Sequence, residues 1–237
     1  MQHGLQGITR PAYVENRKEN VVSNTMLIIG SPNYSSWSFR AWLAVKLSRI
    51  TFELQKIDLD KPETKARLIA ETPAQKVPVL HDEGHVIWDS LAIGLYLAEQ
   101  FPHMLPKHSK ARAEALSVIC EMHSGFSALR ERCSMEMIAK HKYYVRSAAL
   151  DGEIKRIQAI WGQCRANHGN KGPFLMGDYS LVDAFFAPVV SRFVTYDIQV
   201  DEIAQCYMAT VVAEPMYQAW FAMAERDERD RCTAFAR

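Results

Sequence analysis

The first hundred residues alternate short apolar runs with segments in which apolar residues recur at helical spacing. The run "MLIIG" at 26–30 ends in Gly-Ser-Pro, which predicts a short buried strand. Residues 36–47 predict a helix, with apolar side chains at Phe39, Trp42, Leu43 and Leu47. Residues 50–59 alternate apolar and polar positions and predict a second strand.

The pattern then changes from single strands to a hairpin. Residues 61–72 predict a helix with Pro62 near its N-terminus, and "KVPVLHDEGHVIWD" predicts two strands around an Asp-Glu-Gly turn. The segment "DSLAIGLYLAEQF" predicts a helix with one apolar face, formed by Leu91, Leu95 and Ala98. The order up to residue 101 is βαβαββα. A parallel βαβ unit followed by an antiparallel hairpin predicts a mixed sheet covered by helices.

The second half predicts helices only. Residues 102–108 are rich in proline and predict a linker, which divides a first domain at 26–101 from an all-helical domain at 109–237. The expected helices cover 109–140, 143–168, 180–196 and about 200–226. Within the third, Ser180 and Asp183 have the spacing of a helix cap, and "AERDERDRC" predicts a solvated end for the last. Residues 1–25 are either a disordered leader or the product of a start codon assigned too early.

Composition narrows the class of protein. The chain has 237 residues, 48% of them hydrophobic, and a formal net charge of +1, so no overall field favours nucleic acid or an anionic membrane. We expect a soluble protein, since the longest apolar region carries charges and is too short for a membrane span. The five cysteines form no C-x-x-C motif, which favours a reducing compartment such as the cytoplasm.

Two adjacent serines, Ser35 and Ser36, stand where the first strand gives way to the first helix, with Arg40 five residues after Ser35. One interpretation is that they only cap the helix. The other is that one of them holds the reactive group of a ligand, because a hydroxyl and the positive end of a helix together stabilise a thiolate. The rest of the chain favours the second interpretation.

Four stretches in this order, "SSWSFRAWLAV", "QKVPVL", "WDSLAIGLYL" and "GDYSLVDAFFAPV", resemble the glutathione transferase superfamily. The resemblance covers about residues 26–230 and is to the serine-type classes such as zeta, tau and phi. It implies a thioredoxin-like α/β first domain, an all-helical second domain and a cytosolic homodimer. It also implies glutathione as co-substrate without a metal, and transfer of its sulfur to a small hydrophobic electrophile.

The same resemblance implies roles for individual residues. Ser35 is the first choice for the serine that activates the thiol, and Ser36 the second. The peptide would add to the strand edge through the backbone of Val77, before a cis Pro78, with Lys76 facing the glycine carboxylate. Asp89 and Ser90 would take the γ-glutamyl end at a helix N-terminus; the family more often has glutamate where Asp89 stands.

The electrophile pocket is the least defined part of the site. The candidates lie beside the serines and on the first helix of the second domain: Tyr34, Trp37, Met122, His123 and Phe126. Met122 and Phe126 would share a helix face, but such a pair also suits a plain core. His123 is either a general acid or a structural histidine. Arg130, one turn further on, is a candidate to attract an anionic substrate.

Two other functions compete with the transferase. One is the glutathione-dependent cis–trans isomerase of the zeta class, although that class usually has cysteine where Trp37 stands. The other is a non-catalytic transferase-like scaffold, which would not need a complete thiol-peptide site. No cysteine precedes Cys120, which argues against the thiol–disulfide chemistry of omega-class relatives.

Overall fold

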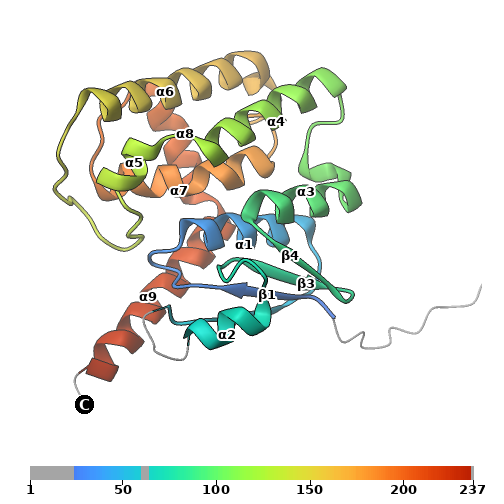
Figure 1. Cartoon of the computed structure of the whole chain (residues 1–237). Coiled ribbons are helices and arrows are strands. Elements are labelled where there is room, and N and C mark those ends of the chain that lie inside the picture. The colour runs from blue at the N-terminus through green and yellow to red at the C-terminus, as the bar shows by residue number, and fades with distance from the viewer. Residues whose placement is uncertain (1–23, 60–63, 236–237) are drawn as a thin grey trace, which may run out of the picture.

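The structure is a computed structural model and describes residues 24–59 and 64–235 (Figure 1). Nearly all of the predicted leader at 1–25, and Pro62 at the start of the second predicted helix, lie outside the described residues. Within them, the βαβαββα order of the first half is confirmed.

A mixed four-stranded sheet forms the centre of the first half. Its strands are β1 (Met26–Ile29), β2 (Glu53–Lys56), β3 (Val79–Asp82) and β4 (His85–Trp88), in the order β2-β1-β3-β4. β1 pairs in parallel with β2, whereas β3 pairs antiparallel with β1 and β4. Helices α1 (Ser36–Ser48) and α3 (Ser90–Gln100) cover one face of the sheet, and α2 (Thr64–Glu71) covers the other (Figure 1).

The buried face of α3 differs from the expected one. Ile93, Gly94, Leu97 and Ala98 are buried, while Leu91 and Leu95 are only partly so. The face is rotated because α3 also packs toward α7 (Leu181–Thr195), where a Cβ on Gly94 would lie 3.1 Å from the side chain of Leu181. The range of the helix was predicted correctly, but its buried face is rotated from the expected one by about one residue position around the helix axis.

The second half is helical, with more breaks than predicted. Its α-helices are α4 (Ser109–Ser124), α5 (Ser127–Arg132), α6 (Ala148–His168), α7, α8 (Glu202–Ala213) and α9 (Pro215–Phe235). Two short 3-10 turns, η1 (Pro102–Met104) and η2 (Gly169–Lys171), complete it.

The single helix expected over 109–140 is wrong. α4 ends at Ser124, Phe126 takes a left-handed φ of 62°, and residues 133–147 form no helix. The helix expected over 200–226 is two helices, separated at Glu214 because Pro215 begins α9, where its missing N–H is not needed.

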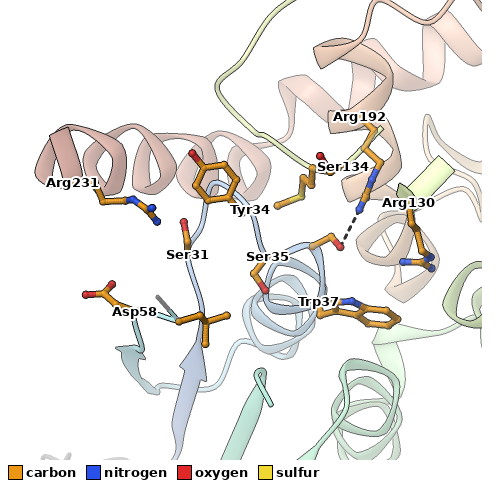
Figure 2. Close-up of a pocket in the computed structure, with 12 residues that line it drawn as sticks. Ser31, Tyr34, Ser35, Trp37, Asp58, Arg130, Ser134, Arg192 and Arg231 are labelled. Carbon is orange, nitrogen blue, oxygen red and sulfur yellow. Dashed lines mark hydrogen bonds between the residues drawn. The ribbon is translucent and has the colours of Figure 1, made fainter. Parts of the chain in front are cut away.

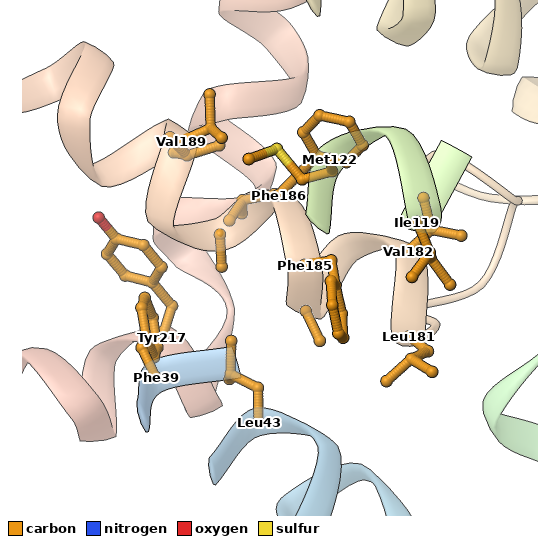
Figure 3. Close-up of a cluster of buried hydrophobic side chains, with 14 of the residues drawn as sticks. Phe39, Leu43, Ile119, Met122, Leu181, Val182, Phe185, Phe186, Val189 and Tyr217 are labelled. Carbon is orange, nitrogen blue, oxygen red and sulfur yellow. The ribbon is translucent and has the colours of Figure 1, made fainter. Parts of the chain in front are cut away.

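The two halves share one hydrophobic core, in which α7 is buried along almost its whole length. Figure 3 shows Phe39 and Leu43 of α1 facing Phe185 of α7 and Tyr217 of α9. Phe39 also stacks on Trp220 at a ring distance of 4.9 Å. The first helix of the sheet domain is therefore fixed directly by helices of the second half.

The start of α7 is held by Asp183, which is fully buried. Its carboxylate accepts hydrogen bonds from the N–H of Leu175 at 3.0 Å, from the N–H of Ser180 at 2.9 Å and from two hydroxyls, those of Ser180 and Tyr207. Burial raises the pKa of Asp183 to about 6, against the lowering effect of these four donors. The predicted pairing of Ser180 with Asp183 is confirmed and extends beyond the helix cap.

The charged segment of α9 is not a freely solvated helix end. Asp227 is buried, forms an ion pair with Lys56 at the end of β2, and accepts a hydrogen bond of 2.7 Å from the hydroxyl of Ser31. Glu228 accepts from Asn33 and from Tyr34, each at 3.3 Å. The expectation failed because only one side of α9 faces solvent, while the other side supports the segment before α1.

We expect Asp227→Asn to lower the free energy of unfolding by about 1–2 kcal/mol. Asparagine keeps the shape of the side chain but removes the charge that pairs with Lys56, which is itself about one third exposed. Urea unfolding measures the change. Asp230→Asn, on the exposed side of the same helix, is the matched control and should change stability by less than about 0.5 kcal/mol. Equal losses in the two variants would contradict a specific role for Asp227.

Candidate functional site

Ser35 both caps α1 and faces a cavity. Its N–H donates to the carbonyl of Ser31 at 2.9 Å, and its Oγ accepts from the N–H of Ser38 at 3.3 Å. The same Oγ lies 2.8 Å from the hydroxyl of Ser38, to which it donates. A hydroxyl can rotate its proton toward a ligand while it still accepts from the backbone. The capping role thus leaves the Ser35 proton available for a ligand.

Ser36 faces the helical half of the protein. It is buried, and its Oγ accepts a hydrogen bond of 3.2 Å from Nη2 of Arg192 on α7 (Figure 2). The two neighbouring hydroxyls therefore have different surroundings, since that of Ser35 contacts α1 and that of Ser36 contacts an arginine.

Both serines line a cavity of about 550 Å³, which we call the arginine pocket. Figure 2 shows its lining residues, of which the following are used below: Tyr34, Ser35, Ser36, Trp37, Arg130 and Arg192. Tyr34 and Trp37, two of the predicted electrophile-pocket residues, belong to it. Arg130 and Arg192 come from α5 and α7, so both halves of the chain build this pocket.

A second cavity, of about 470 Å³, lies on the other side of Trp37, and we call it the peptide pocket. It is lined by five of the six residues predicted for glutathione, which are Lys76, Val77, Pro78, Asp89 and Ser90, whereas the sixth, Ser35, lines the arginine pocket. The five come from the loop before β3 and from the start of α3. The Val77–Pro78 peptide bond is cis. The structure therefore brings these five residues together.

Polar groups of the peptide pocket point to a ligand. Oδ1 of Asp89 accepts from the N–H of Leu91 at 2.7 Å, so this residue caps α3 with a φ of 76°. The hydroxyl of Ser90 is fully buried and has no hydrogen-bond partner within the described residues. Since buried hydroxyls rarely stay unpaired, a polar ligand group at the start of α3 would satisfy this atom.

Trp37 forms the wall shared by the two pockets. The guanidinium carbons of Arg40 and Arg130 lie 4.7 Å and 4.9 Å from the centre of its ring system, within the range of cation–π contact. The ring of His123 meets it edge-on at 5.2 Å. These contacts hold the indole between the peptide pocket and the arginine pocket.

His123 bridges the two halves next to the peptide pocket. Its Nε2 lies 3.4 Å from Oδ2 of Asp89, while its Nδ1 is buried without a partner in the described part of the chain. The pKa of His123 is lowered, mainly because the ring is buried. The positive charges of Arg40 and Arg130 also lower this pKa, whereas the carboxylate of Asp89 opposes the shift. It is not among the lining residues of either pocket.

Met122 and Phe126 are core residues and not pocket walls. Both are buried in the shared hydrophobic core, and neither lines the arginine pocket or the peptide pocket. The predicted common helix face does not exist, because α4 ends between the two residues. The alternative interpretation of the pair as plain core describes their positions correctly.

Sequence reasoning did not assign Arg192 to the site. Arg192 lies in an otherwise apolar stretch of α7 and is 4% exposed. A lone cation in a helix that is buried on all sides was the available signal, since a buried charge needs a partner or a ligand.

Among the described residues, no group of three or more His, Cys, Asp or Glu side chains could hold a metal. No described helix is both long and apolar enough to cross a membrane.

Comparisons with known proteins show the family to which this sequence is similar. Residues 34–100 match the family described as the glutathione S-transferase N-terminal domain. A probable maleylacetoacetate isomerase of Caenorhabditis elegans is 34% identical over 175 residues, which cover 71% of this chain and 79% of that protein. Bovine glutathione S-transferase theta-1 is 34% identical over 96 residues, or 39% of each chain.

Solved structures share the fold. A glutathione transferase homolog from Burkholderia, determined with bound glutathione, superimposes with a TM-score of 0.65 at 20% identity, over 85% of this chain and 98% of that one. The structure of Ure2p in complex with glutathione gives the same TM-score at 14% identity, over 86% and 96% of the two chains. With its thioredoxin-like sheet domain and its helical second half, the chain belongs to the glutathione S-transferase superfamily.

Proposed function

We propose that this protein is a glutathione transferase that joins the glutathione thiolate to a small electrophile. The observation that carries the proposal is the peptide pocket, where Lys76, Val77, Pro78, Asp89 and Ser90 meet within one cavity beside the N-terminus of α1. A pocket with one unpaired buried hydroxyl, a carboxylate and a lysine suits a ligand that has charged groups at both ends, as glutathione does.

The tripeptide would lie along the strand edge. The backbone of Val77 would pair with its cysteinyl residue, and Lys76 would face the glycine carboxylate. At the other end, the free N–H groups and the hydroxyl of Ser90 would take the γ-glutamyl carboxylate, with Asp89 near the ammonium. The ligand would thereby give Ser90 Oγ the hydrogen-bond partner that it lacks among the described residues.

The sulfur would then lie near Ser35, at the positive end of α1. A free thiol with a pKa near 8.5 is only about 3% ionised at pH 7, and a decrease of ~2 units raises that fraction about 25-fold. Because the nucleophilicity of a thiolate falls with its pKa, this ionisation alone accelerates the reaction only about 2–3-fold. Most of the acceleration would come from holding sulfur and electrophile together across the Trp37 wall.

Isothermal titration with glutathione tests the proposal directly. We expect saturable binding below millimolar concentration, and glutathione-dependent conjugation of at least one member of a panel of electrophiles. A failure to bind at millimolar glutathione would favour the non-catalytic scaffold.

We expect Ser90→Ala to weaken glutathione binding by about 10- to 100-fold. The variant removes a hydroxyl that would otherwise bond to a carboxylate, and such charged hydrogen bonds contribute about 1.5–3 kcal/mol. Ser117→Ala, which removes an exposed hydroxyl from α4, is the control and should bind like the original protein. If the Ser90 variant keeps full affinity, the γ-glutamyl group does not lie at the start of α3.

The second candidate function is a glutathione-dependent cis–trans isomerase. It is favoured by the 34% identity to a protein named as a probable maleylacetoacetate isomerase, and it is opposed by Trp37 at the place of the cysteine usual in that class. The two reactions differ in what happens to glutathione. A transferase consumes one molecule for each product, whereas an isomerase releases it unchanged, so the glutathione balance of the reaction separates them.

We further propose that the protein acts in the cytoplasm as a homodimer. The exposed side chains of Val86 and Trp88 on the edge strand β4 offer apolar surface to a second copy. Sedimentation velocity at micromolar concentration tests this part, since a purely monomeric protein would contradict it.

A further inference from the structure

The two carboxylate oxygens of Asp89 have different partners. Oδ1 accepts from the N–H groups of Leu91 at 2.7 Å and Ala92 at 3.4 Å, and thereby caps α3. Oδ2 accepts no hydrogen bond within the described residues, and it lies 3.4 Å from Nε2 of His123 on α4. The side chain of Asp89 is 43% exposed and lines the peptide pocket. Oδ2 is therefore the oxygen that a ligand in this pocket would share with His123.

The ring of His123 is held in place by two aromatic side chains. It meets Trp37 of α1 edge-on at 5.2 Å, and its centre lies 6.2 Å from that of Phe185 on α7. Its side chain is 21% exposed, about half as much as that of Asp89. Since α4 belongs to the helical half and Asp89 to the sheet domain, their contact joins the two halves beside the peptide pocket.

The surroundings of His123 determine where a second proton would go. Because Nε2 faces a carboxylate, the neutral ring is favoured in the form that carries its proton on Nε2. Nδ1 is then the unprotonated nitrogen, and it is buried with no hydrogen-bond partner in the described part of the chain. The proton that makes the ring cationic must go to Nδ1, where no described acceptor would receive its hydrogen bond. This geometry opposes protonation of the ring.

The charges around His123 also oppose protonation. Arg40 on α1 and Arg130 on α5 repel a cationic ring, whereas Asp89 at the start of α3 attracts it. On the same helix as His123, the carboxylate of Glu121 is bound to an arginine of α6 through two hydrogen bonds. Burial and the two arginines outweigh Asp89, so the pKa of His123 lies below its ordinary value. At neutral pH the ring is uncharged, and Asp89 offers its full negative charge to a ligand.

Protonation of His123 would change what Asp89 offers. An ammonium group of a ligand at Oδ2 would lie next to a neutral ring at pH 7 and next to a cation in acid. The cationic ring would neutralise the carboxylate and repel the ammonium at short range. The γ-glutamyl carboxylate expected at Ser90 would act in the opposite direction, so a test must separate the effect of the ammonium from that of the carboxylate.

From this arrangement, we propose that His123 is a positioning residue that sets the charge with which Asp89 holds the ammonium of glutathione, so that protonation of its ring releases the ligand. The inference rests on the proposed function and adds a pH-dependent control to the same site. It differs from the general acid considered from the sequence, because His123 acts through Asp89 and touches no reacting atom. By linkage, bound glutathione makes the ring harder to protonate by the same factor.

Binding of S-methylglutathione tests the inference, because its sulfur cannot ionise. We would titrate it by calorimetry, between pH 7.5 and pH 4.5, into the original protein, into His123→Gln and into His108→Gln. Glutamine keeps an N–H donor at this position but takes up no proton in this range. His108 is the matched control because it is exposed and stands just before α4.

We expect the original protein and His108→Gln to bind S-methylglutathione about 5- to 10-fold more weakly at pH 4.5 than at pH 7.5. The affinity of His123→Gln should change by less than about twofold. The inference is overturned if the original protein shows no weakening, or if His123→Gln weakens as much as the original protein does.

A ligand without the ammonium isolates its effect. In this analogue, glutaryl-S-methylcysteinylglycine, a hydrogen replaces the amino group of S-methylglutathione. Its binding to the original protein should not weaken on acidification, and equal weakening for both ligands would contradict a role of the ammonium. This comparison needs no variant, so it stands even if His123→Gln does not fold.

The titration of His123 itself gives the reciprocal measurement. Proton NMR follows the ring signals with pH, and the signal of His123 is the one missing from His123→Gln. Saturation with S-methylglutathione should lower the pKa of His123 by about one unit, which corresponds to a tenfold effect on binding. An unchanged or raised pKa would overturn the inference.

These measurements also separate the inference from the proposed function. Binding of S-methylglutathione with the same affinity at every pH would refute the role of His123 and leave the glutathione site intact. A failure to bind at millimolar concentration at any pH would instead refute the glutathione site, and the role of His123 with it.

Discussion

Replacement of Ser35 by alanine is expected to reduce the thiolate of bound glutathione at pH 7 by up to about 25-fold, while glutathione still binds. The hydroxyl lies at the N-terminus of α1, so its removal would return the thiol from a pKa lowered by ~2 units toward 8.5. Ultraviolet thiolate absorbance, followed as a function of pH, measures this change. The conjugation rate should fall much less than the absorbance, because a more basic thiolate is a better nucleophile.

Ser36→Ala is the matched control for this experiment. Its hydroxyl accepts from Arg192, so its loss should leave the thiolate absorbance unchanged. If Ser36→Ala abolishes the absorbance and Ser35→Ala does not, the wrong serine has been chosen. If neither does, the thiolate is stabilised by another donor, such as a backbone N–H of α1.

The second large effect is expected for stability. Asp183→Ala should lower the free energy of unfolding by about 3–5 kcal/mol, because it leaves two buried N–H groups and two hydroxyls without their acceptor. Urea unfolding measures the loss. Asp178→Ala, an exposed carboxylate just before α7, should change stability by less than about 0.5 kcal/mol. A loss below about 1 kcal/mol for Asp183→Ala would contradict its central role in the helical half.

The pH dependence gives a second signature of Asp183. Since its pKa rises on folding from 3.8 to about 6, the folded protein binds the proton more tightly than the unfolded chain. The corresponding stabilisation is complete below 3.8 and is lost as the pH rises through about 6. Asp183→Ala should lack this decline. The difference in the free energy of unfolding between the variant and the original protein should therefore become smaller as the pH rises from 3.8 to about 6.

The sheet domain could be predicted closely because its elements are short and end at clear signals. Gly30-Ser-Pro ended β1, Glu83 and Gly84 formed the hairpin turn, and Asp89 began α3. The residues of the peptide pocket follow these same turns. Local sequence therefore determined the elements of this half, whereas the residues of its candidate site were named from the resemblance to the glutathione transferase superfamily.

The arginine pocket could not be predicted in the same way. Its arginines Arg130, Arg192 and Arg231 lie on α5, α7 and α9, and Arg192 reaches Ser36 from 156 residues away in the chain. Phe126 was assigned to the pocket because the helix was expected to continue past Gly125. Helical periodicity does not reveal a single left-handed residue, nor which side of a helix that is buried along almost its whole length turns toward a ligand. Contacts between distant helices decided these points.

The support that α9 gives to the segment before α1 has a consequence for biosynthesis. Ser31 and Pro32 bond to Asp227 and Trp220, which follow them by 196 and 188 residues. These two partners leave the ribosome after every element of the sheet domain has been synthesised. The hydroxyl of Ser35 then gains its final surroundings only late in synthesis, so an unfinished chain carries the turns of the peptide pocket before the surroundings of Ser35 are complete.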